Sequence, residues 1–311
     1  MLTFTITASD HCRSVESFLR NLLPAAPISY LKKLIKSGHL AVNGASPLPG
    51  TILKLADTIT LKESSKIREL LTGRRPEADI LYEDQWIVVF NKPPDIPVHR
   101  AAEDEGRNMV QLGEKFLAER GMKADTDDRA RTAAYKLRPV NRLDRGTSGA
   151  VIMAKSPTAA GMFGRLVKEE GLGKLYLAVM EGTPPDEGTI TAPVEGKESE
   201  TRYRLIFQGE EGALAAVYPV SGRMHQIRQH FKLIGHPVWG DRRYGGRPLP
   251  GFAGHALHSF RTTLTHPATG ERLAIYAPLP EGIRSLISRL AGNTYAHVLQ
   301  SLPDIPAEII R

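Results

Sequence analysis

The spacing of apolar residues predicts two short helices near the N-terminus. Apolar residues recur at helical spacing between Ser14 and Leu23, and Pro24 ends this segment. A second helix should follow, with Ser29 as its N-cap and Gly38 at its end. Its apolar face consists of Leu31, Leu34 and Ile35. This part of the chain is therefore expected to form a small helical unit.

Strand-like and polar stretches complete the first quarter of the chain. HLAVNG (39–44) reads as a short strand and turn, and TILKLADTITL (51–61) as a pair of strands. The polar, basic stretch that follows is interrupted by Gly73 and Pro76, which favours a linker. We therefore expect an N-terminal α/β module at 1–75, a larger domain at 76–290 and a helical appendage at 291–311.

The larger domain mixes strands with a few helices. ILYEDQWIVVFNKPPDIPVH (80–99) predicts two strands, with Pro93 and Pro94 forming an extended or turn segment between them. Helices are expected around 109–120 and 158–169, and a polar surface excursion leads from the first of these to Arg138. Beyond Ala150 the pattern consists mainly of β-prone runs separated by Gly and Pro.

Composition excludes several classes of protein and leaves nucleic acid as a candidate partner. No apolar run approaches the roughly 20 residues that span a bilayer, and the first residues do not resemble a secretory signal, so a cytoplasmic protein is expected. A single cysteine, Cys12, excludes an internal disulfide and a thiolate-rich zinc site. Of the net charge of +7, +6 falls in residues 1–75, which favours a polyanionic partner or a well-solvated basic surface.

NRLDRGTSGAVIMAKS (141–156) carries the chemistry of greatest interest. Asp144 stands between Arg142 and Arg145, and opposite charges within a few ångströms keep a carboxylate ionised. Gly146 and Gly149 allow tight backbone geometry close to a ligand. Taken alone, the triplet is more typical of a surface ion pair on a turn, so it decides nothing by itself.

Four further blocks change this interpretation when they are read together with the first. They are NKPPDIPVHR (91–100), GKLYLAVMEG (173–182), SGRMHQIRQHFKLIGHPVWGDRRYGG (221–246) and HALHSFRTTLTHPATGERLAIYAPLP (255–280). In this order the five blocks resemble the pseudouridine synthases, in the branch that acts on ribosomal and transfer RNA and carries an HRLD-x-x-TSG motif. The resemblance runs from about Ile80 to Pro280.

The resemblance implies an α+β protein with a mixed, largely antiparallel sheet and flanking helices. It also implies a reaction that needs no cofactor or metal. Uridine becomes pseudouridine when its glycosidic bond breaks and the uracil is rejoined to the sugar through carbon. By resemblance, Asp144 is the catalytic carboxylate, which attacks the sugar, attacks the base or accepts the ribose 2′ proton. Arg228 pairs with this aspartate, and Tyr176 lies against the target base.

A uridine in folded RNA must leave its stack to reach such a pocket, so the enzyme needs groups that grip phosphates and fill the vacated space. The candidates are Arg142, Arg145, Arg223 and His225. Asp241 is expected to fix a loop, and Ser148 lacks the His-Asp pattern of a nucleophile. The histidines are scattered along the chain, so no metal site is expected.

The N-terminal module resembles the small "S-four" RNA-binding fold between about Arg13 and Lys62, with LIKSGHLAVNG (34–44) at its centre. That family usually has Arg where Tyr30 stands here. Next to an RNA-modifying domain, three lysines of the second helix favour phosphate contact over a merely solvated face. They are Lys32, Lys33 and Lys36.

The function implied is isomerisation of uridines in structured RNA, with ribosomal RNA favoured and transfer RNA second, by a protein expected to be a monomer. Asn141 stands where the family has His, and this departure supports the alternative of a non-catalytic RNA-binding or ribosome-assembly protein. A nucleoside hydrolase that uses the same carboxylate is a third interpretation.

Overall fold

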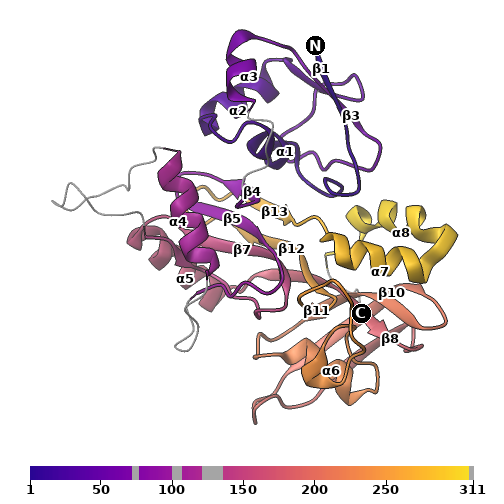
Figure 1. Cartoon of the computed structure of the whole chain (residues 1–311). Helices are drawn as coiled ribbons and strands as arrows, with labels where there is room; N and C mark the ends of the chain where they lie inside the picture. The colour runs from indigo at the N-terminus through magenta and orange to yellow at the C-terminus, as the bar shows by residue number, and fades with distance from the viewer. Residues whose placement is uncertain (72–76, 100–106, 121–135, 308–311) are drawn as a thin grey trace.

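The computed structural model describes residues 1–71, 77–99, 107–120 and 136–307. The domain boundary expected near residue 75 and the polar excursion after residue 120 fall outside the described residues. Figure 1 shows a small N-terminal module, in indigo and violet, that sits against one edge of a larger body built around an extended sheet. The α+β class expected from the sequence is confirmed.

The N-terminal module combines three strands with three helices. The strands form an antiparallel sheet in the order β1-β3-β2. The elements are β1 (Leu2–Thr5), α1 (Val15–Leu22), α2 (Ile28–Lys36), β2 (Leu40–Val42), β3 (Thr58–Leu61) and α3 (Ser65–Leu70). Leu19 of α1 and Leu34 of α2 pack with Ile59 of the sheet in a core of their own. The amphipathic spacing seen in the sequence therefore reflects real burial.

Both helices predicted in this module are present, but three details differ. Ser14 caps α1 as a side-chain acceptor, whereas the prediction of Ser29 as the cap of α2 is wrong. Pro27 occupies that position, because its ring already fixes φ at −59° and the helix begins at the next residue. Stretch 51–61 contains one strand rather than two, since Ala56 adopts a left-handed turn (φ 69°). Helix α3, which the sequence did not predict, is capped by Ser64.

The larger body is a ten-stranded sheet in the order β4-β5-β7-β12-β8-β11-β10-β9, with β13 beside β12 and β6 beside β7. Its strands are β4 (Ile80–Glu83), β5 (Ile87–Lys92), β6 (Arg138–Pro139), β7 (Ser148–Ala154), β8 (Gly173–Glu181), β9 (Glu187–Thr191), β10 (Glu200–Gln208), β11 (Gly212–Pro219), β12 (Leu257–Thr265) and β13 (Arg272–Tyr276). Strands β7 and β12 run parallel, and the other described pairs of this sheet are antiparallel. The expected mixed, largely antiparallel sheet is confirmed.

The turn between the first two strands of this sheet lies elsewhere than predicted. Asp84 makes the turn, because its carboxylate accepts hydrogen bonds from the backbone N–H groups of Trp86 and Ile87. Pro93 and Pro94 follow β5 instead of separating the pair. They therefore direct the chain away from the sheet toward the loop that carries Asp144.

Helices cover both faces of the sheet around its centre. They are α4 (Met109–Glu119), α5 (Pro157–Glu169), α6 (Gln226–Leu233), α7 (Glu281–Ala291) and α8 (Tyr295–Ser301). All seven residues of β7 are buried, since Val151 and Met153 face one core while Ala150 and Ile152 face the other. No helix in the described ranges has the length and apolar character needed to cross a bilayer. The predicted helices at 109–120 and 158–169 are confirmed as α4 and α5.

The N-terminal module is joined to the sheet by buried polar contacts. Asn21 of α1 pairs with both backbone groups of Ile80 on the edge strand β4: its amide nitrogen donates to the carbonyl (2.8 Å) and its oxygen accepts from the N–H (3.2 Å). Arg13 forms a forked pair with Asp79 at 2.7 and 2.9 Å. Cys12 belongs to the core of the larger body. The side chain of Asn21 thus takes the place that a further strand would occupy.

The C-terminal segment expected as an appendage contributes to the same core. Leu299 and Leu302 are buried in it, and the backbone carbonyl of Leu299 bonds the His11 ring at 2.5 Å. Arg261 on β12 donates to the carbonyls of Ile305 and Pro306. This segment therefore links the N-terminal module to the sheet.

Acid is expected to destabilise the fold through a buried histidine. His258 is fully buried, accepts from Ser148 Oγ (2.8 Å) and donates to the Ala277 carbonyl (3.0 Å), and burial lowers its pKa to about 4. An unfolded histidine has a pKa near 6.5. Between pH 6.5 and 4 this histidine is therefore mainly protonated in the unfolded chain and mainly neutral in the folded one. Stability contributed by neutral His258 is complete above pH 6.5 and is lost as pH falls toward 4.

The size of this effect is about 2 kcal/mol at pH 5. Urea unfolding at pH 7 and pH 5 should show this loss in the parent protein. The variant His258→Gln, whose amide can still donate to the Ala277 carbonyl but cannot titrate, should show a smaller difference between the two pH values. The remainder is assigned to the other histidines whose pKa burial lowers, which are His255 (to about 4), His11, His225 and His230. Equal pH dependence in parent and variant would contradict the assignment.

Candidate active site

Asp144 lies on a loop that forms hydrogen bonds with buried side chains. Lys92, which is fully buried at the end of β5, donates to the carbonyls of Pro93, Ile96 and Arg145 at 2.8–2.9 Å. Burial lowers the pKa of Lys92 to about 7, an effect that the nearby Asp144 opposes. The lysine therefore connects the segment after β5 to the backbone beside Asp144.

A second support comes from the segment before β12. The hydroxyl of Thr147 bonds His255 Nε2 at 2.7 Å, and the N–H of Thr147 donates to the carbonyl of Asp144. A Cβ on Gly146 would lie 2.8 Å from the His255 ring, and one on Gly149 (φ 117°) would lie 2.3 Å from the Ser259 carbonyl. Both glycines are thus required by close packing within the protein, and their place next to a ligand stays a prediction.

Arg228 of α6 holds Asp144 and is itself held by a second carboxylate. Its Nη1 donates to Asp144 Oδ2 at 2.9 Å, while Nε and Nη2 donate to the two oxygens of Asp241 at 2.6 and 2.8 Å. Arg228 and Asp241 are 7% and 1% exposed, so this fork is shielded from water. Asp241 fixes the guanidinium, and the guanidinium fixes one oxygen of Asp144. Oδ1 of Asp144 accepts no hydrogen bond from any described residue.

The ion pair around Asp144 differs from the one expected from the RLD triplet. Arg145, one of the two flanking arginines, directs its guanidinium to Asp95, with 3.0 Å between Nε and Oδ1. The cation bonded to the carboxylate is Arg228, which is 84 positions away in the sequence. The expectation that the flanking arginines pair with Asp144 is therefore corrected: the ion pair comes from Arg228 of α6.

His225 and Tyr244 close one side of the site. His225 has left-handed backbone geometry (φ 55°), its Nε2 lies 3.7 Å from Asp144 Oδ2, and its Nδ1 bonds the Tyr244 hydroxyl at 3.0 Å. Burial lowers the pKa of His225, which favours the neutral ring, and the nearby Asp144 opposes this shift. The Arg228 guanidinium lies 5.0 Å from the centre of the Tyr244 ring. These contacts fix the start of α6 next to the carboxylate.

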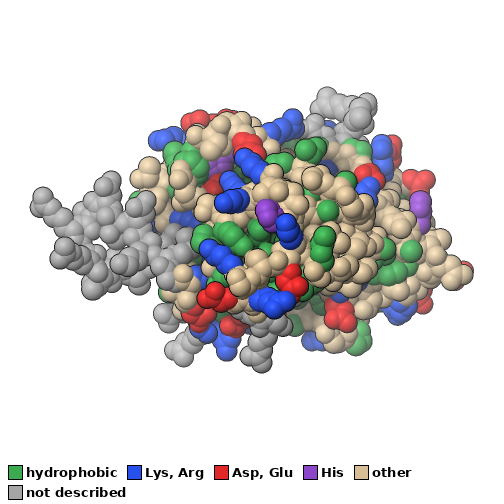
Figure 2. Space-filling model, turned by 90° about the horizontal axis from the view of Figure 1, so that it is seen from above, with side chains coloured by type: hydrophobic (Ala, Val, Ile, Leu, Met, Phe, Trp, Pro, Cys, Tyr) green, Lys and Arg blue, Asp and Glu red, His purple; other side chains and the backbone are tan. Residues whose placement is uncertain are grey.

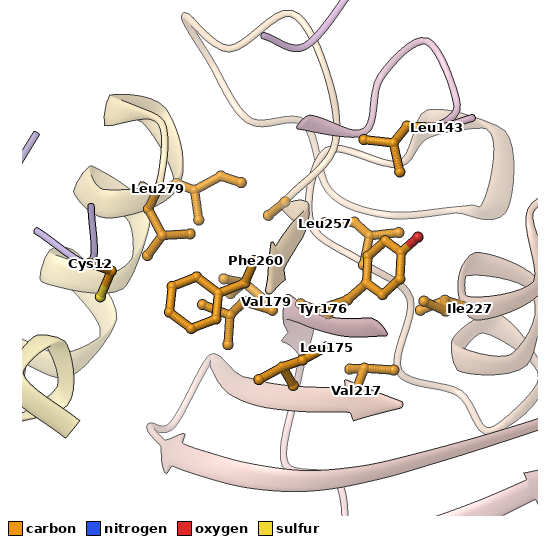
Figure 3. Close-up of a cluster of buried hydrophobic side chains, with 14 of the residues drawn as sticks. Cys12, Leu143, Leu175, Tyr176, Val179, Val217, Ile227, Leu257, Phe260 and Leu279 are labelled. Carbon is orange, nitrogen blue, oxygen red and sulfur yellow. The ribbon is translucent and has the colours of Figure 1, made fainter. Parts of the chain in front are cut away.

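Tyr176 of β8 forms the apolar floor of a pocket of about 180 Å³ that opens beside Asp144. Figure 3 shows its ring beside Leu257, with Ile227 of α6 close by and the hydroxyl directed toward the loop of Leu143. The side chain is 8% exposed, and burial raises the pKa of the phenol to about 12. A flat, neutral ring at the base of a charged pocket can stack against a nucleobase.

The other residues predicted to contact RNA divide into two groups. Arg142, Arg223 and His225 line the pocket, together with the three expected catalytic residues. Arg145 lies outside the lining. The lysines of α2 are exposed on the N-terminal module, away from the pocket, and Figure 2 views the molecule from that end, where Lys and Arg side chains lie among hydrophobic ones. These lysines are Lys32, Lys33 and Lys36.

Two positions noted in the sequence are explained by backbone contacts. Asn141 is buried and pairs with β7, donating to the Ala150 carbonyl (3.2 Å) and accepting from Ile152 N–H (2.7 Å). It does not line the pocket, so the feature that favoured a non-catalytic protein lies outside the site. Ser148 does contact a histidine, His258, but both are buried, which leaves no exposed nucleophile there.

Sequence reasoning missed the roles of three residues of the site, although Asp241 was expected to fix a loop. Lys92 supports the Asp144 loop, Asp241 anchors Arg228, and Lys174 lines the pocket. The KLY block offered one signal, since Lys174 and Tyr176 are two positions apart on a strand and must share a face. Across the described ranges, no cluster of three His, Cys, Asp or Glu side chains is arranged to hold a metal ion.

Comparison with known proteins identifies the family. A family model described as RNA pseudouridylate synthase matches residues 86–233, which include Asp144, Tyr176 and Arg228. Ribosomal large subunit pseudouridine synthase C of Escherichia coli (strain K12) is 30% identical over 318 residues, which cover 92% of this chain and 95% of that protein. The chain belongs to the RNA pseudouridine synthase family.

Other RNA pseudouridine synthases show the same extent of similarity. An uncharacterized RNA pseudouridine synthase of Bacillus subtilis (strain 168) is 30% identical over 309 residues, covering 93% of this chain and 98% of that protein. Among solved structures, human RNA pseudouridylate synthase domain containing 4 matches with a TM-score of 0.54 and 21% identity, over 68% of this chain and 92% of that one. The latter match shows a common fold. RNA pseudouridine synthases are isomerases, and this chain is assigned to that class.

Proposed function

We propose that this protein isomerises specific uridines of ribosomal RNA to pseudouridine, with Asp144 as the catalytic carboxylate. The observation that carries the proposal is the pocket in which Asp144, Arg228 and Tyr176 meet from three separate parts of the chain. The name of the similar Escherichia coli protein refers to the large ribosomal subunit, which favours ribosomal RNA over transfer RNA as the substrate. A cytoplasmic monomer is the form we expect to act.

The geometry suits a reaction at an extruded nucleotide. Arg228 holds Oδ2 of Asp144 and leaves Oδ1 directed to the substrate, either to form an adduct or to accept the ribose 2′ proton. Tyr176 supplies a face for uracil while the base is detached and turned. Arg142 and Arg223 line the pocket, and their charges can neutralise RNA phosphates there. The lysines of α2 supply a second contact with RNA at a distance from the pocket.

The proposal is tested by mapping pseudouridine in ribosomal and transfer RNA from cells with and without the gene. We expect one or a few positions of large-subunit RNA to lose pseudouridine, and the purified protein to restore them in RNA transcribed in vitro. Modification of transfer RNA alone would overturn the ribosomal assignment. Identical maps and RNA binding without turnover would favour the non-catalytic alternative, and release of free uracil would indicate a hydrolase.

A further inference from the structure

Lys174 occupies a position in the pocket to which neither the motif nor the proposed chemistry assigns a role. It lies on β8, two residues before Tyr176, so both side chains project from the same face of the strand. Both line the pocket that contains Asp144. The side chain of Lys174 is therefore presented to whatever binds above the Tyr176 ring.

The ammonium group of Lys174 has no partner in the described part of the chain. Among the described residues, none forms a hydrogen bond or an ion pair with it, and the lysine is only partly exposed. Burial alone lowers its pKa, and no carboxylate of the described residues opposes the shift. A half-buried cation without a partner is unfavourable in the free protein, and an anionic ligand relieves this cost.

We propose that Lys174 binds a phosphate group of the RNA backbone next to the extruded nucleotide. This inference rests on the proposed function and names the part of the substrate that the pocket holds. Uracil and ribose are neutral, so the phosphates that flank the target are the anions that RNA can bring into this pocket.

The charges around the pocket support a phosphate over an internal partner. Asp144, the carboxylate of the lining, is already bonded to Arg228, whose charge is shared with the buried Asp241. Arg142 and Arg223 add two exposed cations to the same lining. The pocket therefore has an excess of positive charge, and Lys174 is its most enclosed unpaired cation among the described residues.

The salt dependence of RNA binding tests the proposal. The probe is a synthetic RNA hairpin that carries the mapped target, with pseudouridine at that position so that no turnover occurs during the measurement. Lys174→Met should bind about tenfold more weakly than the parent, and the slope of log affinity against log salt should fall by about 0.7–0.9, the value for one phosphate contact. Lys168→Met removes an exposed lysine of α5 that does not line the pocket, and its slope should stay unchanged. Lys174→Arg should retain most of the slope.

A second measurement locates the phosphate. Replacing each phosphate that flanks the target by an uncharged methylphosphonate should weaken binding of the parent at one position, and should add nothing to the loss in Lys174→Met. Additive losses at both positions, or an unchanged salt slope, would overturn the inference. So would normal binding with a lower kcat and a shifted pH profile, because that result would place Lys174 in proton transfer. If the parent protein forms no pseudouridine in the uridine hairpin, the proposed function fails instead.

Discussion

Replacing Asp144 by Asn is expected to lower the rate of pseudouridine formation at least about 10³-fold. The amide has the same shape and can still accept a hydrogen bond from Arg228, but it can neither form the adduct nor accept a proton. RNA affinity should change little, because the cations proposed to contact phosphates, Arg142, Arg223 and Lys174, are kept. Single-turnover assays and equilibrium binding on the same RNA separate the two effects.

A matched variant controls for the loss of one negative charge. Asp186→Asn changes an exposed carboxylate that does not line the pocket, and it should leave the rate and the affinity unaltered. Product formation by Asp144→Asn at a rate comparable to the parent protein would refute the role given to this residue.

Arg228→Lys is expected to reduce kcat about 10²-fold although the positive charge is retained. A lysine ammonium cannot reproduce the fork to Asp241 together with the bond to Asp144. One of the two carboxylates then loses its partner, and Asp241 is almost fully buried, so the free energy of unfolding should also fall by about 1–3 kcal/mol. Urea unfolding and single-turnover rates measure the two effects.

An exposed arginine of α5, Arg165, provides a matched control for Arg228→Lys. Arg165→Lys makes the same chemical change away from the pocket and should alter neither quantity. Full activity in Arg228→Lys would show that a point charge is sufficient, and would contradict the view that a forked contact orients Asp144.

Local patterns in the sequence predict the elements that depend on local forces. The helices α1, α4 and α5 follow from apolar spacing and side-chain caps, and Ser14 acts as such a cap. The prediction of Ser29 as the N-cap of α2 is wrong, because Pro27 fixes the backbone one residue before the helix begins. Helix α3 was not predicted, because it begins at two serines in a polar stretch and Ile67 is the residue that it buries.

The candidate site could be predicted only where a motif joined distant residues. The resemblance placed Asp144, Tyr176 and Arg228 in one pocket, and the structure brings them together. The role of Asp241 depends on a fork to Arg228 that crosses from a loop to a helix, which no local pattern specifies. Lys92 was also missed, because a lysine in a sequence indicates a solvated charge unless three carbonyls are known to surround it.

The contact between Asn21 and β4 has a consequence for how the protein can be divided. Strand β4 is the last strand on its side of the ten-stranded sheet, and the amide of Asn21 covers the backbone N–H and carbonyl of Ile80 there. A fragment that starts after the N-terminal module would carry a bare β edge, through which two copies could pair or begin to aggregate. By covering this edge, the small module is expected to prevent association of the larger body through β4, in addition to any contact that it makes with RNA.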